Sequence, residues 1–141
     1  LWGTQRPRFL IVEPDQANCL QQSAKAGKPV TVHGSLETLM AGLACGEVSS
    51  LAWEILAEGA NDFLTLSEDA IPQTMKMLAS GESHSEKIEA GESAVPGLAA
   101  ALIARSDTEL AKTLELDSDS RVLVIGTEGA TDPDLRSLIH I

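Results

Sequence analysis

The sequence predicts an α/β domain built on a mostly parallel sheet with helices on both faces. Short apolar runs occur at Phe9–Glu13 and Asp62–Leu66, and a third begins at Arg121. Continuous apolar runs of this length are typical of strands that are buried on both faces. Helical patterns separate the runs, as they do in parallel α/β folds. The length of 141 residues suits one domain, and we find no internal repeat or low-complexity linker.

The first strand should be followed by two helices. Asp15 can cap a helix from about Gln16 to Ala26, and Gly27 can end that helix in the left-handed conformation. Ser35 is expected to cap a short helix that runs through Leu43.

A third helix is expected from Leu51 to Ala60, with apolar residues on one side. These residues are Leu51, Ala52, Ile55 and Leu56.

After the second strand, Ser67 is expected to cap a helix whose first turn carries Glu68 and Asp69, where carboxylates complement the helix dipole. The buried face of this helix should consist of Ile71, Met75 and Leu78.

The last third of the chain should contain two helices before the third strand. An Ala-rich helix is expected to end near Arg105, with Pro96 in its first turn, where proline is tolerated. Ser106–Glu109 has the pattern of a capping box that opens a further short helix. A polar turn over 117–120 then leads into the strand.

The strand from Arg121 ends abruptly in the polar segment Gly-Thr-Glu-Gly-Ala-Thr-Asp, residues 126–132. In open parallel sheets, ligands bind where strands end at their carboxyl edge. On these residues alone, a core strand followed by an ordinary turn is about equally good as an interpretation.

Composition and charge make several functions unlikely. A net charge of −11 repels phosphate backbones and anionic lipids, so neither nucleic acid nor a membrane surface is expected as a partner. The sequence shows no apolar run long enough to span a membrane and no signal-peptide pattern. Cys19 and Cys45 are well separated, which favours reduced thiols and a cytoplasmic protein. The three histidines are scattered, so no metal site is expected.

Two carboxylates are candidates for a functional role. Glu13 follows a strand, but a capping or salt-bridge role is the favoured interpretation. Glu92 lies at the mouth of the Ala-rich helix, where it could complement the helix dipole or point into a site. We find no phosphate-binding fingerprint and no nucleophile motif.

Four blocks of sequence, in this order, closely resemble the C-terminal part of the diaminopropionate ammonia-lyases. These blocks are Phe9–Asp15, Thr38–Glu47, Ile88–Ala94 and Val122–Asp132. The lyases are pyridoxal-phosphate enzymes of fold type II, the tryptophan synthase β-like superfamily. The resemblance covers nearly the whole chain, and IVEPDQANC, MAGLACGE and TEGATD are its most specific parts.

The resemblance implies three cofactor-binding residues. Thr127 matches the hydroxyl residue that hydrogen-bonds the pyridine nitrogen of pyridoxal 5'-phosphate. Glu92 matches a carboxylate that approaches the Schiff-base and phenolate side of the cofactor, and Gly42 matches a backbone position packed near the ring. Glu128 replaces a glycine found in many superfamily members, but it agrees with the lyases.

The resemblance also implies that residues 1–141 are the C-terminal portion of a larger domain. The superfamily attaches its cofactor through a lysine and holds the phosphate in a Gly-rich loop. The lysines of this chain, which are Lys25, Lys28, Lys76, Lys87 and Lys112, do not occur in that context. We therefore expect the attaching lysine and the phosphate loop to precede Leu1, and we assign no catalytic residue to this chain.

The expected activity of the parent enzyme is α,β-elimination of 2,3-diaminopropionate to pyruvate and ammonia, in a homodimer. Two alternatives remain open. One is a pyridoxal-phosphate enzyme with another amino-acid substrate, such as a serine or threonine dehydratase. The other is a non-catalytic α/β module.

Overall fold

The centre of the molecule is a two-stranded parallel sheet. A computed structural model describes residues 3–81, 86–134 and 137. Strand β1 (Leu10–Pro14) pairs with β2 (Asp62–Leu66), and the register runs from Leu10 opposite Asp62 to Pro14 opposite Leu66. Both of the first two predicted strands are therefore confirmed.

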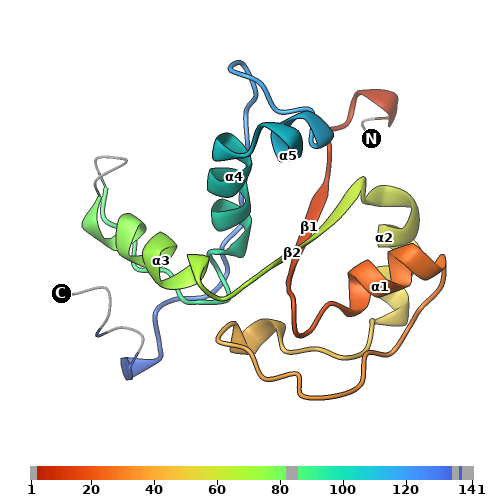
Figure 1. Cartoon of the computed structure of the whole chain (residues 1–141), viewed down its shortest axis with the longest axis horizontal. Coiled ribbons are helices and arrows are strands. Elements are labelled where there is room, and N and C mark those ends of the chain that lie inside the picture. Colours follow the sequence, from red (N-terminus) through yellow and green to blue (C-terminus); the bar gives the residue numbers. More distant parts are fainter. Residues whose placement is uncertain (1–2, 82–85, 135–136, 138–141) are drawn as a thin grey trace.

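Helices lie on opposite sides of the two strands. Between β1 and β2 the chain forms α1 (Cys19–Ala26), a 3-10 turn η2 (Ala41–Leu43) and α2 (Ser50–Gly59). Figure 1 shows α1 and α2 on one side of the strands and α4 (Pro96–Ser106) on the other. A short 3-10 turn, η1 (Gly3–Gln5), precedes β1.

The main core lies where α4 meets the sheet and α3 (Ala70–Ser80). Helix α5 (Thr108–Thr113) follows α4 and packs against it. The buried cluster consists of Met40, Leu66, Ile71, Met75, Val95, Ala99 and Ala100. The predicted inner face of α3 is confirmed, with Ile71 and Met75 fully buried and Leu78 packed against the cluster.

The predicted helix over 35–43 is wrong apart from the short turn η2. The Ser35 hydroxyl accepts the Glu37 N–H, and the Glu68 carboxylate accepts the Leu39 N–H. The first bond is one that a helix cap would also make, but the second takes an amide that would have donated to the Ser35 carbonyl in the helix. Buried Met40 ties the segment to the core.

Two helices begin later than the sequence predicts. Helix α1 begins at Cys19 rather than near Gln16, although Gly27 ends it as expected, with φ 67°. Helix α3 begins at Ala70 with no side-chain cap. The carboxylate of Glu68, placed in its first turn by the prediction, is instead bound to Leu39.

The short helix α5 is capped by Asp107 and not by Ser106. The Asp107 carboxylate accepts the N–H groups of Glu109 and Leu110, both at 3.0 Å. The Ser106 hydroxyl donates to the Ile103 carbonyl of α4, at 2.9 Å, so it belongs to the end of the preceding helix.

The apolar side predicted for α2 is only partly buried, with Ala52 and Leu56 half-buried. The helix has the predicted extent, and Ser49 caps it through the Ala52 N–H. Leu51 and Ile55 are nevertheless exposed, because no other element in the described part of the chain covers them.

The third predicted strand does not form in the described structure. Residues 121–125 have no strand partner, and the exposed fraction is 86 % at Leu123 and 80 % at Ile125. Figure 1 shows this segment running beside α4 rather than joining β1 and β2. A strand requires a hydrogen-bonded neighbour, and residues 121–125 have none in the described structure. The chain forms an isolated antiparallel bridge only further on, between Gly129 and Ala90.

Candidate functional site

Three segments far apart in the sequence meet at one point, which we call the three-loop junction. It comprises Gly42, the loop 91–93 and the segment 128–129. The Gly91 N–H donates to the Glu128 carbonyl at 3.0 Å, and the Ser93 N–H donates to the Glu128 carboxylate oxygen Oε2 at 2.7 Å. The Gly42 N–H donates to the Ser93 hydroxyl oxygen at 2.9 Å. These bonds join the segments into one wall.

Two of the three predicted site residues, Gly42 and Glu92, fall within this junction, and the third, Thr127, adjoins it. Gly42 is itself a donor, Glu92 lies between two of the bonded residues, and Thr127 immediately precedes Glu128. The structure therefore brings the candidate segments together.

Close backbone packing at the junction requires glycine at two positions. A Cβ atom on Gly91 would lie 2.5 Å from the Gly129 carbonyl oxygen and 2.6 Å from Glu128 Oε2. A Cβ on Gly42 would lie 2.9 Å from the Ser93 hydroxyl oxygen. Any side chain at these two positions would push the segments apart.

Glu92 is buried at the junction without a polar partner in the described part of the chain. Its exposed fraction is 7 %, and no described residue donates a hydrogen bond or forms an ion pair with its carboxylate. Burying a carboxylate without a partner is costly. Glu92 is therefore a group with hydrogen-bonding capacity left for a ligand.

The Thr127 hydroxyl is also available. Thr127 is exposed, and its hydroxyl makes no hydrogen bond with another described residue. The neighbouring Gly126 lies against Ala94, since a Cβ there would be 3.3 Å from the Ala94 carbonyl oxygen. This contact holds the segment before Thr127 against the start of α4.

A mostly apolar hollow of about 330 Å³ adjoins the junction. Ile88, Val95 and Val124 supply apolar walls, and Glu128 contributes a carboxylate. The hollow therefore combines apolar surface with a charged group that already binds the neighbouring loop.

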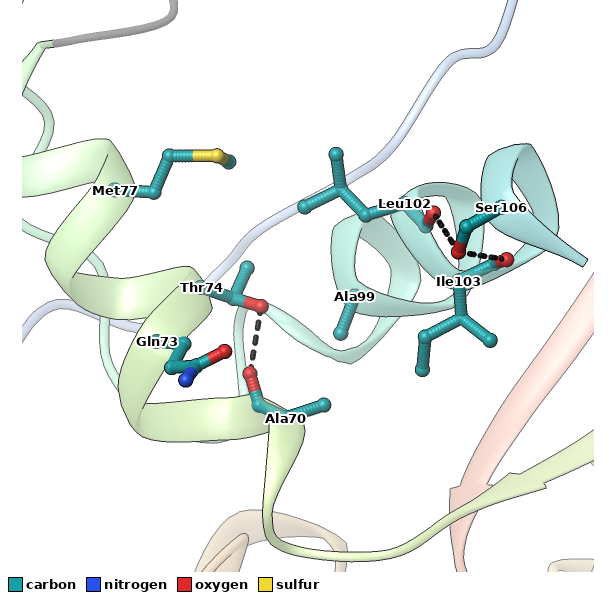
Figure 2. A pocket seen from close by; sticks show the side chains of 8 residues that line it. All are labelled: Ala70, Gln73, Thr74, Met77, Ala99, Leu102, Ile103 and Ser106. Carbon is teal, nitrogen blue, oxygen red and sulfur yellow. Dashed lines mark hydrogen bonds between the residues drawn. The ribbon is translucent and has the colours of Figure 1, made fainter.

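A second groove, of about 360 Å³, lies between α3 and α4 (Figure 2). Its two hydroxyls are turned back onto their own helices: Thr74 donates to the Ala70 carbonyl at 2.7 Å, and Ser106 donates to the Ile103 carbonyl. Apart from Gln73, the rest of the lining is apolar. We regard this groove as a packing feature of two helices.

Glu13 is a helix cap, as the sequence favoured. Its carboxylate oxygens accept the Leu20 N–H at 2.9 Å and the Gln21 N–H at 2.8 Å, at the start of α1. Burial raises the pKa of Glu13, and these two N–H bonds oppose the shift. The carboxylate is thus committed to the fold and is not free for a ligand.

Sequence reasoning missed Ser93 and Gly91, and it noted Glu128 without giving it a role. In the sequence these residues are visible only as parts of the tripeptides Gly-Glu-Ser and Thr-Glu-Gly. Ser93 and Glu128, which are hydrogen-bonded in the structure, are 35 residues apart along the chain. A short polar tripeptide does not indicate which distant backbone it will contact.

Other chemical groups are distributed away from this junction. The side chains of all the lysines are exposed, and Lys25 and Lys112 bond to neighbours on their own helices, Gln21 and Glu109. Within residues 3–81, 86–134 and 137, no cluster of three or more His, Cys, Asp or Glu side chains could hold a metal ion. His84 and His140 lie outside the described residues. No described helix is both long and apolar enough to cross a membrane.

The sequence matches the family described as pyridoxal-phosphate dependent enzymes over residues 1–128. It is 38 % identical over 135 residues to the diaminopropionate ammonia-lyase of Escherichia coli strain K12. The alignment covers 94 % of this chain and 34 % of the relative. The chain thus spans about a third of the length of the curated relatives it matches.

The structure is similar to solved structures of such proteins. One is the Escherichia coli diaminopropionate ammonia lyase in complex with an aminoacrylate-PLP azomethine reaction intermediate, with a TM-score of 0.82 and 36 % identity. This match covers 92 % of the chain and 33 % of the lyase. Another is maize serine racemase, with a TM-score of 0.73 and 27 % identity over 92 % of the chain and 36 % of the racemase.

Proposed function

Because the chain belongs to the family of pyridoxal-phosphate-dependent enzymes, we propose that it is part of an ammonia-lyase that converts 2,3-diaminopropionate and water to pyruvate and ammonia. The observation that carries this proposal is the 38 % identity to a diaminopropionate ammonia-lyase over nearly the whole chain. The resemblance to this family and the α/β architecture of a fold type II enzyme, both expected from the sequence, are confirmed.

The residues of the three-loop junction fit the cofactor chemically. Neither buried Glu92 nor the Thr127 hydroxyl has a hydrogen-bond partner among the described residues, so both have hydrogen-bonding capacity to offer. The Thr127 hydroxyl would donate to the pyridine nitrogen, and Glu92 would face the Schiff-base and phenolate side. The backbone at Gly42 would pack near the ring, at a position where no side chain fits.

When bound, pyridoxal phosphate supplies an electron-withdrawing ring that takes up the electron pair left by removal of the substrate Cα proton. A neutral hydroxyl at Thr127 does not hold a proton on the pyridine nitrogen, whereas a carboxylate would. With Thr127 at this position, the cofactor ring would withdraw electrons only moderately, which suits loss of a β-amino group from the substrate.

The group that attaches the cofactor belongs, in this proposal, outside residues 1–141. The exposed lysines of the chain support this assignment, since none lies buried beside the three-loop junction. Residues 1–141 would then be the C-terminal portion of the large domain, forming one wall of the site and supplying no catalytic residue. Isolated chain mixed with pyridoxal phosphate should show no stoichiometric absorption band from a lysine-bound cofactor.

We extend the proposal to a cytoplasmic homodimer that acts on a small amino acid. Cys19 and Cys45 are both free thiols in the structure, which is in keeping with a reducing compartment. The homodimer rests on the family resemblance. Sedimentation of the full-length protein would test it.

The activity is tested with full-length protein, pyridoxal phosphate and a set of amino acids. We expect pyruvate release from 2,3-diaminopropionate with a kcat/KM at least about tenfold above that for serine or threonine, a difference of ~1.4 kcal/mol in transition-state stabilisation. Preferred turnover of serine or threonine would instead identify a dehydratase-like enzyme. Absence of cofactor binding and of any turnover would favour a non-catalytic module.

A further inference from the structure

Glu128 makes two different contacts with the loop that carries Glu92. Its backbone carbonyl accepts the Gly91 N–H at 3.0 Å, and its carboxylate accepts the Ser93 N–H at 2.7 Å. We propose that Glu128 is a positioning residue that holds the Glu92 carboxylate in place for the cofactor. This inference rests on the proposed function.

The two contacts lie on either side of Glu92. A hydrogen bond to the preceding amide and another to the following amide restrain the backbone at both ends of this residue. Glu92 itself has no described polar partner that could orient its buried side chain. Its position therefore depends on the backbone that Glu128 holds.

The same carboxylate reaches the third segment through Ser93. Its Oε2 holds the Ser93 N–H, and the Ser93 hydroxyl oxygen accepts the Gly42 N–H at 2.9 Å. The Glu128 side chain thus binds Ser93, and Ser93 in turn binds the third segment at Gly42. Removing the Glu128 side chain would break the restraint on the Ser93 side of Glu92, while the backbone bond to the Gly91 N–H would remain.

A carboxylate is well suited to this task. Hydrogen bonds to an ionised acceptor are shorter and stronger than neutral ones, in keeping with the 2.7 Å distance to the Ser93 amide. The side chain also fills space, because its Oε2 lies where a Cβ on Gly91 would approach to 2.6 Å. Glutamine keeps an oxygen acceptor and nearly the same volume, whereas alanine loses both.

The test uses full-length protein and two readouts, the dissociation constant for pyridoxal phosphate and the absorption maximum of the bound cofactor. Glu128→Ala should raise the dissociation constant by about 10- to 100-fold, as expected for loss of a charged hydrogen bond, and should shift the absorption maximum. Glu128→Gln should stay within about fivefold of the wild type. The matched control Glu109→Gln removes an exposed carboxylate on α5 and should change neither readout.

A purely structural role would lower the melting temperature without moving the absorption maximum of the bound cofactor. That result, or an unchanged dissociation constant in Glu128→Ala, would overturn the inference. The proposed function would still stand if the wild-type protein binds pyridoxal phosphate and releases pyruvate. If the alanine variant does not fold, Glu128→Met decides, because it keeps most of the side-chain volume and removes the acceptor of the Ser93 N–H. It should raise the dissociation constant by about 3- to 10-fold, and no rise would overturn the inference. Wild-type protein that binds no pyridoxal phosphate would overturn the proposed function and this inference together.

Discussion

At the scale of single residues, three glutamates of this chain act as acceptors for the backbone of another segment. Glu13 binds the start of α1, Glu68 binds the Leu39 amide, and Glu128 binds the Ser93 amide. Glu92 differs from them because it is buried without such a partner in the described structure. This contrast separates carboxylates that build the fold from one that remains available to a ligand.

Replacing Thr127 by aspartate tests the proposed contact with the pyridine nitrogen. A carboxylate would hold a proton on that nitrogen and increase the electron demand of the ring, which is unfavourable for the proposed elimination. We expect kcat of the full-length enzyme to fall by about tenfold or more, or ~1.4 kcal/mol, with a changed cofactor spectrum. Thr127→Ser keeps the hydroxyl and serves as the control. Unchanged turnover together with an unchanged spectrum would contradict the assignment of Thr127.

The raised pKa of Glu13 predicts a pH dependence of stability. Burial raises the pKa in the folded state, while the unfolded chain keeps an ordinary value of about 4.3. The folded state therefore binds the proton more tightly, and the stability contributed by this linkage is present below pH ~4.3 and is lost as pH rises through the folded pKa.

Urea unfolding of the wild type and Glu13→Gln at several pH values measures this effect. The free energy of unfolding of the wild type should fall relative to that of the variant as pH rises from about 4 towards 7. Glu58→Gln, at an exposed site on α2 whose side chain has no polar partner among the described residues, is the control and should follow the wild type. A constant difference between wild type and Glu13→Gln over this range would refute the prediction.

At the scale of elements, the sequence predicts the order of the helices along the chain more accurately than the residue at which each helix begins. The sequence placed the starts of α1 and α3 at the nearest capping residues, Asp15 and Ser67. The structure uses Glu13 of β1 for α1 and diverts Glu68 of the α3 region to Leu39. A local pattern identifies a possible cap, but a carboxylate from another element can satisfy the same amides, and that competition cannot be read locally.

Helix α5 gives a direct test of cap assignment. Asp107→Ala should lower the free energy of unfolding by about 1 kcal/mol, because the Glu109 and Leu110 amides lose their acceptor. Ser106→Ala, at the position that the sequence favoured, should change it by less than about 0.5 kcal/mol. Denaturant unfolding of both variants measures the difference. A larger loss for Ser106→Ala than for Asp107→Ala would show that the assignment is wrong.

At the scale of the whole molecule, the sequence predicted the parallel sheet but overestimated its extent. β1 and β2 were predictable because each is a short apolar run whose partner lies in the same chain. The run at 121–125 has the same composition, yet composition reports only that a segment is suited to burial and not which strands will cover it. The candidate site shows the same limit. Gly42, Glu92 and Thr127 came from a family resemblance, and the bonds through Ser93 and Glu128 that join their segments appeared only in three dimensions.

The exposed run at 122–125 predicts opposite behaviour for the isolated chain and for a complete enzyme. Leu123 and Ile125 are 86 % and 80 % exposed, and adjacent apolar side chains of this kind promote association. We expect the isolated 141-residue chain to self-associate, and Leu123→Lys with Ile125→Lys to reduce that association in sedimentation experiments. In a longer protein that covers this run with further strands, the same pair should lower the melting temperature, because two charges would be buried. Gln16→Lys with Ser118→Lys adds the same charge at exposed positions and should do neither. If the isolated wild-type chain is monomeric, or the Leu123 and Ile125 pair leaves the longer protein as stable as before, the run is not a covered strand.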